Sequence, residues 1–131
     1  MNELINIAID GPAGAGKSTI AKLVAERLGI IYIDTGAMYR AVALKCLNKD
    51  ICLNARDDIL NLLQDTDIEV EFGNIEQKLF LDGKNVSDNI RDDNVSNAAS
   101  CIAKLPEVRT KLVDIQRDIA KKMSVVMDGR D

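Results

Sequence analysis

The segment that most constrains the fold of this chain is GPAGAGKS, residues 11–18. A short, nearly continuous apolar run, residues 5–9, comes directly before it and is typical of a strand buried on both faces of a parallel sheet. The residues after it have apolar side chains at the spacing of a helix face, and Gly29 suits the cap of that helix. These apolar positions are Ile20, Leu23, Val24 and Leu28. A strand that turns through glycines into a helix predicts an α/β fold.

The same segment matches the phosphate-binding pattern G-x-x-x-x-G-K-[ST]. Glycines allow backbone N–H groups to converge on phosphate oxygens, Lys17 supplies a positive charge to the β- and γ-phosphates, and Ser18 offers a hydroxyl to Mg²⁺. A dinucleotide-binding loop fits less well because Thr19 stands where that pattern requires glycine. The candidate ATP-binding residues are Gly11, Pro12, Ala13, Gly14, Ala15, Gly16, Lys17, Ser18 and Thr19.

The rest of the chain alternates between helical and extended patterns. A second buried strand is expected at residues 30–33, a helix at 34–48 that buries Val42, Ala43, Cys46 and Leu47, and another helix from Asn54. Residues 67–88 alternate in polarity and contain the turn dipeptides Gly73-Asn74 and Asp82-Gly83, so we expect an antiparallel hairpin or meander exposed on one face. Helices follow from about Asp93 and from Pro106, the latter with a core stripe of Val108, Leu112, Ile115 and Ile119. A third buried strand is expected at residues 124–128.

Composition excludes several classes of function. A net charge of −4 over 131 residues argues against nucleic acid or a membrane surface as the partner. The sequence has no histidine, which excludes an imidazole base or a histidine metal ligand. Its three cysteines form no C-x-x-C pair, so we expect no disulfide framework or zinc site and a cytoplasmic location. The first residues have no basic leader and no long apolar stretch, so neither a signal peptide nor a membrane span is expected.

Charged residues follow the second and third predicted strands. Asp34, Thr35 and Arg40 come after one strand, and Asp128 and Arg130 come after the other. Open α/β sheets bind ligands outside the carboxyl ends of their strands, and guanidinium groups match phosphate oxygens. We therefore expect Arg40 and Arg130 to hold a second phosphate-bearing substrate. Taken alone, Arg40 would be a solvated helix arginine and Arg130 a terminal residue with no fixed place. Tyr39 is expected to pack, and Asp34 to act either as a helix cap or as a partner of Mg²⁺.

Five segments in this order resemble bacterial-type cytidylate kinase: IAIDGPAGAGKST, IDTGAMYRAVAL, NVSNAAS, PEVR and MDGRD. The resemblance implies a nucleoside monophosphate kinase fold, with a parallel sheet, flanking helices and a small antiparallel insertion. It implies a single, incomplete kinase domain over residues 1–131, with the α/β core at 1–50 and 104–131 and the acceptor-binding region, which includes the β-hairpin insertion, at about 51–103. It also implies transfer of a phosphoryl group from ATP to CMP or dCMP with Mg²⁺, in pyrimidine nucleotide metabolism.

The resemblance also assigns roles to residues in the acceptor site. Arg40 and Arg130 would hold the CMP phosphate with help from Thr35, while Ser100, Arg109 and Asp128 would face the cytosine. An ionised Asp128 can accept a hydrogen bond from the cytosine amino group, whereas uracil presents an acceptor at that position. The attacking oxygen of the acceptor phosphate is already anionic, so no general base is needed, in agreement with a histidine-free sequence.

Members of that family continue well past residue 131, into further strands and a mobile lid that contributes arginines. We therefore expect a chain of these 131 residues alone to lack effective kinase activity, because a single such arginine can be worth ~10³–10⁵ in rate. A full-length protein is expected to be a monomer. Two alternatives remain open, a shikimate-type kinase in which Asp34 binds a hydroxyl acceptor, and a nucleotide-binding module without catalysis.

Overall fold

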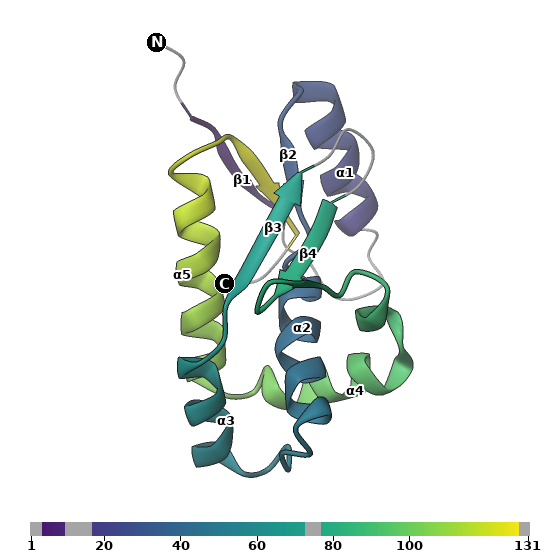
Figure 1. Ribbon diagram of the computed structural model, residues 1–131. Helices are drawn as coiled ribbons and strands as arrows, with labels where there is room; N and C mark the ends of the chain where they lie inside the picture. Colours follow the sequence, from purple (N-terminus) through teal and green to yellow (C-terminus); the bar gives the residue numbers. More distant parts are fainter. Residues whose placement is uncertain (1–3, 10–16, 73–76, 129–131) are drawn as a thin grey trace. The chain divides into compact units, whose positions relative to one another are not determined.

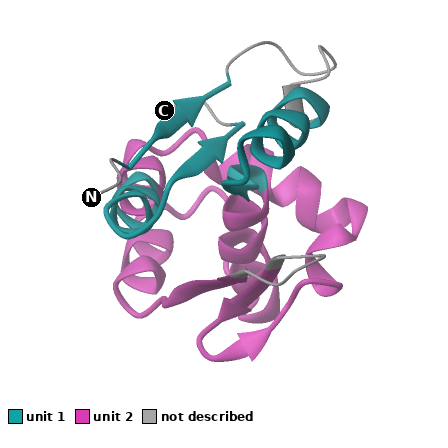
Figure 2. Ribbon diagram, turned by 90° about the horizontal axis from the view of Figure 1, so that it is seen from above, with its two compact units in different colours: residues 1–36, 113–131 teal, residues 37–112 magenta. Residues whose placement is uncertain are grey.

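A computed structural model of the chain describes residues 4–9, 17–72 and 77–128 (Figure 1). The chain divides into two compact units (Figure 2). Unit 1 consists of residues 1–36 and 113–131, and unit 2 of residues 37–112. Each unit is described by itself below.

Unit 1 is built on a parallel sheet of three strands. The strands are β1 (Asn6–Ala8), β2 (Ile31–Ile33) and β6 (Val125–Met127), and their order across the sheet is β1-β6-β2. Val126 of the central strand lies beside Ile7 on one side and Tyr32 on the other. The sheet confirms the predicted α/β core, and it places the last predicted strand between the first two.

Helix α1 (Lys17–Leu28) packs on one face of this sheet. Ala21 and Ala25 are buried against Val126, and Val24 packs beside them. The expected apolar face was therefore wrong at three positions, because Ile20, Leu23 and Leu28 are 48%, 49% and 52% exposed. The small alanines let the helix approach the strands closely, and the larger side chains lie to either side of that contact. Gly29, with φ of +67°, follows the helix as the predicted glycine cap.

Unit 2 contains most of the helical residues. Helix α2 (Thr35–Asn48) begins in unit 1 and continues into unit 2, where α3 (Arg56–Gln64) and α4 (Asp93–Ile102) follow, and α5 (Pro106–Ala120) crosses back. A short 3₁₀ helix, η1 (Asn89–Arg91), precedes α4. The most completely buried side chains in this unit include Met38, Val42, Cys46, Ile59, Ile102, Val108 and Leu112. Leu47, Ile115 and Ile119, which we expected in the core, are only partly buried.

The predicted antiparallel segment is a meander of three strands, β3 (Ile68–Phe72), β4 (Gln77–Leu81) and β5 (Lys84–Asn85). Asp82 and Gly83 form the turn between β4 and β5, with φ of +51° and +84°. Positive φ at both central residues is what a two-residue hairpin turn requires, which explains the Asp-Gly pair. Ile68 is buried while Glu69 and Glu71 are exposed, so one face of the meander packs and the other meets solvent, as predicted.

Among the described helices, α4 and α5 start at residues with a clear local reason, whereas α3 does not. Asp92 caps α4, since its carboxylate accepts a hydrogen bond of 2.9 Å from the backbone N–H of Asn94. Helix α5 begins at Pro106, as expected. The expected start of a helix at Asn54 was wrong, because α3 begins at Arg56 and its capping residue is Ala55, which has no side chain able to bond the helix N-terminus.

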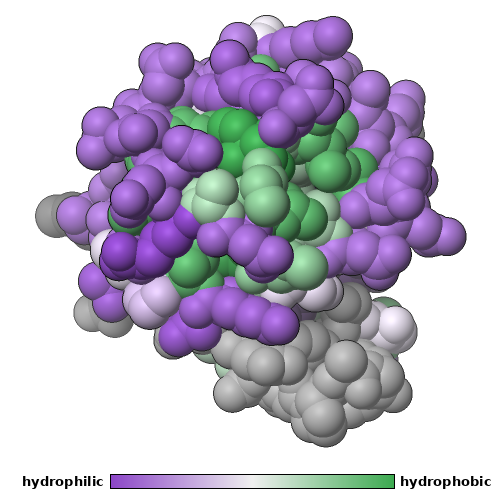
Figure 3. Space-filling view, turned by 90° about the horizontal axis from the view of Figure 1, so that it is seen from below, coloured by the Kyte–Doolittle hydropathy of each residue, from purple (hydrophilic) through white to green (hydrophobic). Residues whose placement is uncertain are grey.

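Hydrophobic residues are not all enclosed. Figure 3 shows one face of the molecule on which they gather in a patch surrounded by hydrophilic side chains. Apolar atoms ordinarily make up a little over half of a folded protein's surface.

Within the described ranges, no helix combines the length and the hydropathy that a membrane span needs.

Candidate functional site

The carboxyl edge of the parallel sheet in unit 1 gathers several of the predicted site residues. Ile33 at the end of β2 lies beside Met127 at the end of β6, so Asp34 and Asp128 follow neighbouring strand ends. On the other side of β6, the backbone N–H of Ile9 donates a hydrogen bond of 2.7 Å to the carbonyl of Met127. The three strand ends thus meet at one edge, where an open α/β sheet binds its ligands.

The glycine segment connects this edge to α1 in the sequence. β1 ends at Ala8 and α1 begins at Lys17, so the backbone of Lys17 and Ser18 forms the first residues of the helix. Thr19 follows in the same turn and is exposed. Six of the predicted ATP-binding residues, Gly11, Pro12, Ala13, Gly14, Ala15 and Gly16, lie outside the described residues, as does Arg130.

Asp128 is almost enclosed at this edge, with 6% of its surface exposed. The hydroxyl of Tyr32 donates a hydrogen bond of 2.7 Å to Oδ2 of Asp128. Tyr32 lies beside Val126 in the sheet and packs against the cluster of Ala21, Ala25 and Val126. Tyr32 was not among the predicted site residues, although its place in the predicted strand, two residues before Asp34, indicated that the side chains of Tyr32 and Asp34 share one face.

Thr35 and Arg40 lie in α2, on either side of the boundary between the units. Thr35 is the first residue of the helix, belongs to unit 1 and is 5% exposed. Arg40 lies one turn further along, belongs to unit 2 and is partly buried. Tyr39, which we expected to pack, is also partly buried.

The two candidates for base recognition from unit 2, Ser100 and Arg109, are exposed side chains on α4 and α5. The hydroxyl of Ser100 donates a hydrogen bond of 3.3 Å to the carbonyl of Ser96, one turn earlier in the helix. Arg109 lies in the first turn of α5, close in sequence to Glu107, whose carboxylate pairs with Arg56 of α3. Both candidate side chains are therefore accessible to a ligand.

A buried lysine in unit 2 forms a polar cluster that the sequence analysis missed. Lys45 of α2 has a side chain only 6% exposed, and its ammonium group lies 2.7 Å from a carboxylate oxygen of Asp82. It also donates hydrogen bonds to the carbonyl of Asp65 and, at 3.2 Å, to the hydroxyl of Thr66. The other carboxylate oxygen of Asp82 accepts a bond of 2.8 Å from the backbone N–H of Asp67. Lys45 thereby joins α2 to the end of α3 and to the β4–β5 turn.

This cluster shifts the pKa of the carboxyl group at its centre. Burial by itself would raise the pKa of Asp82, but hydrogen bonds from Lys45 and from the Asp67 amide, with the charges of Lys45 and Lys49, hold it below its ordinary value. Nearby, burial raises the pKa of the Cys46 thiol, against the smaller lowering effects of a backbone hydrogen bond and of the Lys45 charge. The sequence carried no signal for the cluster beyond one lysine within an apolar helical stretch.

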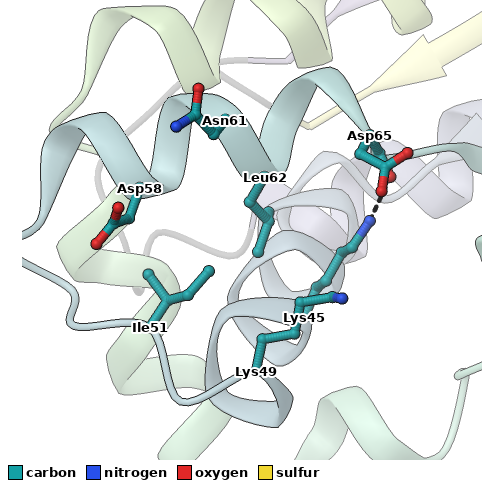
Figure 4. A pocket seen from close by; sticks show the side chains of 7 residues that line it. All are labelled: Lys45, Lys49, Ile51, Asp58, Asn61, Leu62 and Asp65. Carbon is teal, nitrogen blue, oxygen red and sulfur yellow. Dashed lines mark hydrogen bonds between the residues drawn. The ribbon is translucent and has the colours of Figure 1, made fainter.

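A pocket of about 290 Å³ opens beside the same cluster, between α2 and α3 (Figure 4). Ile51 and Leu62 provide apolar lining, and Lys49 and Asp58 contribute charges of opposite sign. Lys45 also lines the pocket, but it points toward Asp65 and its ammonium group is held by the contacts given above. In the part of the chain that the structure describes, no group of three or more acidic, cysteine or histidine side chains gathers in a way that could hold a metal.

Comparison with known proteins finds one family over nearly the whole chain. Residues 7–131 match the family model described as cytidylate kinase. Similar curated proteins, each named cytidylate kinase, include those of Caldicellulosiruptor saccharolyticus (57% identical over 127 residues), Pediococcus pentosaceus (53% over 131) and Clostridioides difficile (50% over 125). These alignments cover 97%, 100% and 95% of this chain, but 56%, 58% and 56% of the relatives. The chain thus spans a little over half the length of the curated relatives it matches.

Proposed function

Because this chain belongs to the cytidylate kinase family, we propose that the protein transfers the γ-phosphoryl group of ATP to CMP or dCMP, giving CDP or dCDP. The observation that carries the proposal is the family match over residues 7–131, which includes every candidate site residue. The parallel sheet supports it, since three strand ends meet where the glycine segment begins. We place the activity in pyrimidine nucleotide metabolism in the cytoplasm, in keeping with free cysteines.

On the donor side, the backbone of residues 11–16 would hold the ATP phosphates, with Lys17 at the β- and γ-phosphates. The start of α1 adds the partial positive charge of a helix N-terminus. Mg²⁺ would be held through the phosphates and the Ser18 hydroxyl, where it neutralises charge on the transferring group. The residues at this edge fit such an ion, because Asp34 and Asp128 follow adjacent strand ends and hard oxygen ligands suit Mg²⁺.

On the acceptor side, Arg40 and Arg130 would hold the CMP phosphate and Thr35 would assist them. Arginine presents a planar fork that binds two phosphate oxygens at once, which orients the acceptor for in-line attack. Ser100 and Arg109 would donate hydrogen bonds to the ring acceptors of cytosine, and their exposed side chains leave them accessible. Most of the acceptor-binding region would then belong to unit 2.

We assign Asp128 to recognition of the cytosine amino group, because its carboxylate can accept a hydrogen bond from that group. Uracil presents an oxygen at the same position, which would face the carboxylate without a proton between them. Asp128 also lies on the face of the sheet that α1 covers, the helix that follows the glycine segment. The test of this assignment must therefore separate base recognition from a contribution to Mg²⁺.

In the reaction itself, an anionic oxygen of the CMP phosphate attacks the γ-phosphorus of ATP. A new phosphorus–oxygen bond forms to CMP while the bond from the γ-phosphorus to the bridging oxygen breaks, and ADP leaves with that electron pair. No proton has to be removed from the nucleophile. Catalysis then depends on positioning and on stabilisation of charge by Lys17 and the arginines.

An assay of ADP release by the full-length gene product, with CMP, dCMP, UMP, AMP and shikimate as acceptors, tests the proposal. Turnover with CMP and dCMP above the others is expected. Turnover with shikimate alone would replace the proposal with a hydroxyl-acceptor kinase, and ATP binding without turnover would indicate a non-catalytic module. Asp128→Ala should reduce the preference for CMP over UMP, whereas an equal loss with both, together with a higher Mg²⁺ requirement, would move Asp128 to the donor side.

A further inference from the structure

The side chain of Tyr32 contacts Asp128 through a hydrogen bond of 2.7 Å. We propose that Tyr32 is a positioning residue, which fixes the carboxylate of Asp128 in the orientation that the site uses. The inference rests on the proposed function, because it concerns the carboxylate assigned there to the site. It holds whether Asp128 binds the cytosine base or contributes to Mg²⁺ binding.

The sheet explains why these two side chains meet. β2 and β6 run parallel, and Tyr32 lies directly beside Val126. Side chains alternate along a strand, so Asp128, two residues after Val126, extends to the same face as Tyr32. The phenol hydroxyl reaches the carboxylate from that face at 2.7 Å.

The tyrosine ring is itself held in place. It packs against the buried cluster of Ala21, Ala25 and Val126, and the ammonium group of Lys22 lies 5.6 Å from the ring centroid. A cation at that distance is attracted to the face of the ring. Side chains from α1 and β6 thus contact Tyr32, which restricts where its hydroxyl can lie.

A carboxylate at the end of a short side chain rotates readily, because its terminal torsion has broad minima. A hydrogen bond from a neutral hydroxyl to a carboxylate oxygen is among the stronger hydrogen bonds in proteins, so it restricts this rotation. With Oδ2 held by Tyr32, the plane of the carboxylate is set, and with it the direction in which Oδ1 presents its lone pairs. A ligand group that binds Oδ1 then meets a fixed acceptor.

The experiment uses Tyr32→Phe, Asp128→Asn and the double variant in the full-length gene product. Two quantities are measured in each, the ratio of kcat/KM for CMP to that for UMP, and the Mg²⁺ concentration that gives half of the maximal rate. Both are independent of the fraction of correctly folded enzyme, so a partly misfolded variant still gives an answer. Lys22→Met is the matched control, since the exposed Lys22 lies over the same ring, while the packing of the ring on Ala21, Ala25 and Val126 stays in place.

We expect Tyr32→Phe to change whichever quantity Asp128→Asn changes, in the same direction and by about threefold to tenfold, which corresponds to the net contribution of one ordinary hydrogen bond. In the Asp128→Asn background the effect of Tyr32→Phe should disappear, and Lys22→Met should leave both quantities within about twofold of the original protein.

Three results would overturn the inference. The first is a clear effect of Asp128→Asn with none from Tyr32→Phe, which would leave the proposed function intact. The second is an undiminished effect of Tyr32→Phe in the Asp128→Asn background, which would give Tyr32 a role of its own. The third is no effect from Asp128→Asn, which would remove Asp128 from the site together with the need to position it, whether or not CMP is phosphorylated.

Discussion

Removal of the Asp82 carboxylate should destabilise unit 2 far more than removal of the Lys45 ammonium group that it neutralises. The two side chains differ in burial, at 6% exposed for Lys45 and 41% for Asp82. Asp82→Ala leaves a buried ammonium group whose other acceptors among the described residues are neutral, the carbonyl of Asp65 and the hydroxyl of Thr66. Lys45→Met leaves a carboxylate that water and the Asp67 amide still solvate.

The magnitudes follow from this asymmetry. Breaking a fully buried ion pair from one side costs about 3–5 kcal/mol, and the partial exposure of Asp82 places Asp82→Ala at the lower end, about 3 kcal/mol. Replacement of a buried charge by an apolar side chain of similar length is often close to neutral, so Lys45→Met should cost about 1 kcal/mol or less. The double variant should cost clearly less than the two single variants added together, because Asp82→Ala acts mainly through the buried charge that Lys45→Met removes. What remains of the Asp82→Ala cost is the lost bond from the Asp67 amide and the strain of alanine at a positive φ.

Urea unfolding of the four proteins at pH 7 measures these differences as free energies of unfolding. Native-state hydrogen exchange gives a local measure, since the backbone N–H groups of Asp67 and Asp82 bond across this junction and should lose protection first in Asp82→Ala. An equal cost for both single variants, or additivity in the double variant, would refute the asymmetry and the account of Lys45 as a buried charge.

Three further outcomes are expected. Because the pKa of Asp82 is held below its ordinary value, its contribution to stability is present above about pH 4 and is lost as the pH falls through the lowered pKa; in urea titrations the difference in stability between Asp82→Asn and the original protein should therefore shrink as the pH is lowered below about 4. Burial and a raised pKa make Cys46 slow to react, so a thiol reagent at pH 7.5 should label Cys52 and Cys101 rapidly and Cys46 only on unfolding; fast labelling of all three would contradict the packing of α2. Ile102→Ala, at a fully buried position of α4, should cost about 2–5 kcal/mol in the same denaturation assay, and a loss below about 1 kcal/mol would show that α4 is not packed as described.

The sequence predicted the strands and turns well where a local pattern had one physical solution. The alternation of Ile68, Glu69, Val70 and Glu71 fits only a half-buried strand, and Asp82-Gly83 supplies the positive φ values of a tight turn. The buried face of helix α1 was harder to predict, because alanine is less hydrophobic than the leucine and isoleucine residues of the helix, yet Ala21 and Ala25 are the side chains buried against Val126. Contacts between distant segments could not be predicted, and both Lys45–Asp82 and Tyr32–Asp128 depend on how strands and helices pair in space.

For the candidate site too, the sequence predicted what depends on local patterns and missed what depends on contacts between distant segments. The strand ends that carry Asp34 and Asp128 lie side by side, as the predicted parallel sheet required. The roles of Arg40, Ser100 and Arg109 stay proposals, and so do those of the glycine segment and Arg130, which lie outside the described residues. A short motif such as the glycine segment can be recognised from the sequence alone. The orientation of the Asp128 carboxylate, in contrast, depends on Tyr32, which lies 96 positions away in the sequence.

The order β1-β6-β2 has a consequence for how the chain folds during synthesis. The central strand is also the last of the three to leave the ribosome, and the contact between Ile5 and Ser124 spans 119 positions. At a rate of synthesis of about 5–20 residues per second, β6 is made several seconds after β1 and β2, so the sheet cannot form before then. Unit 2 is one continuous segment and can pack within that interval, so it would nucleate first and shorten the loop that the parallel sheet has to close.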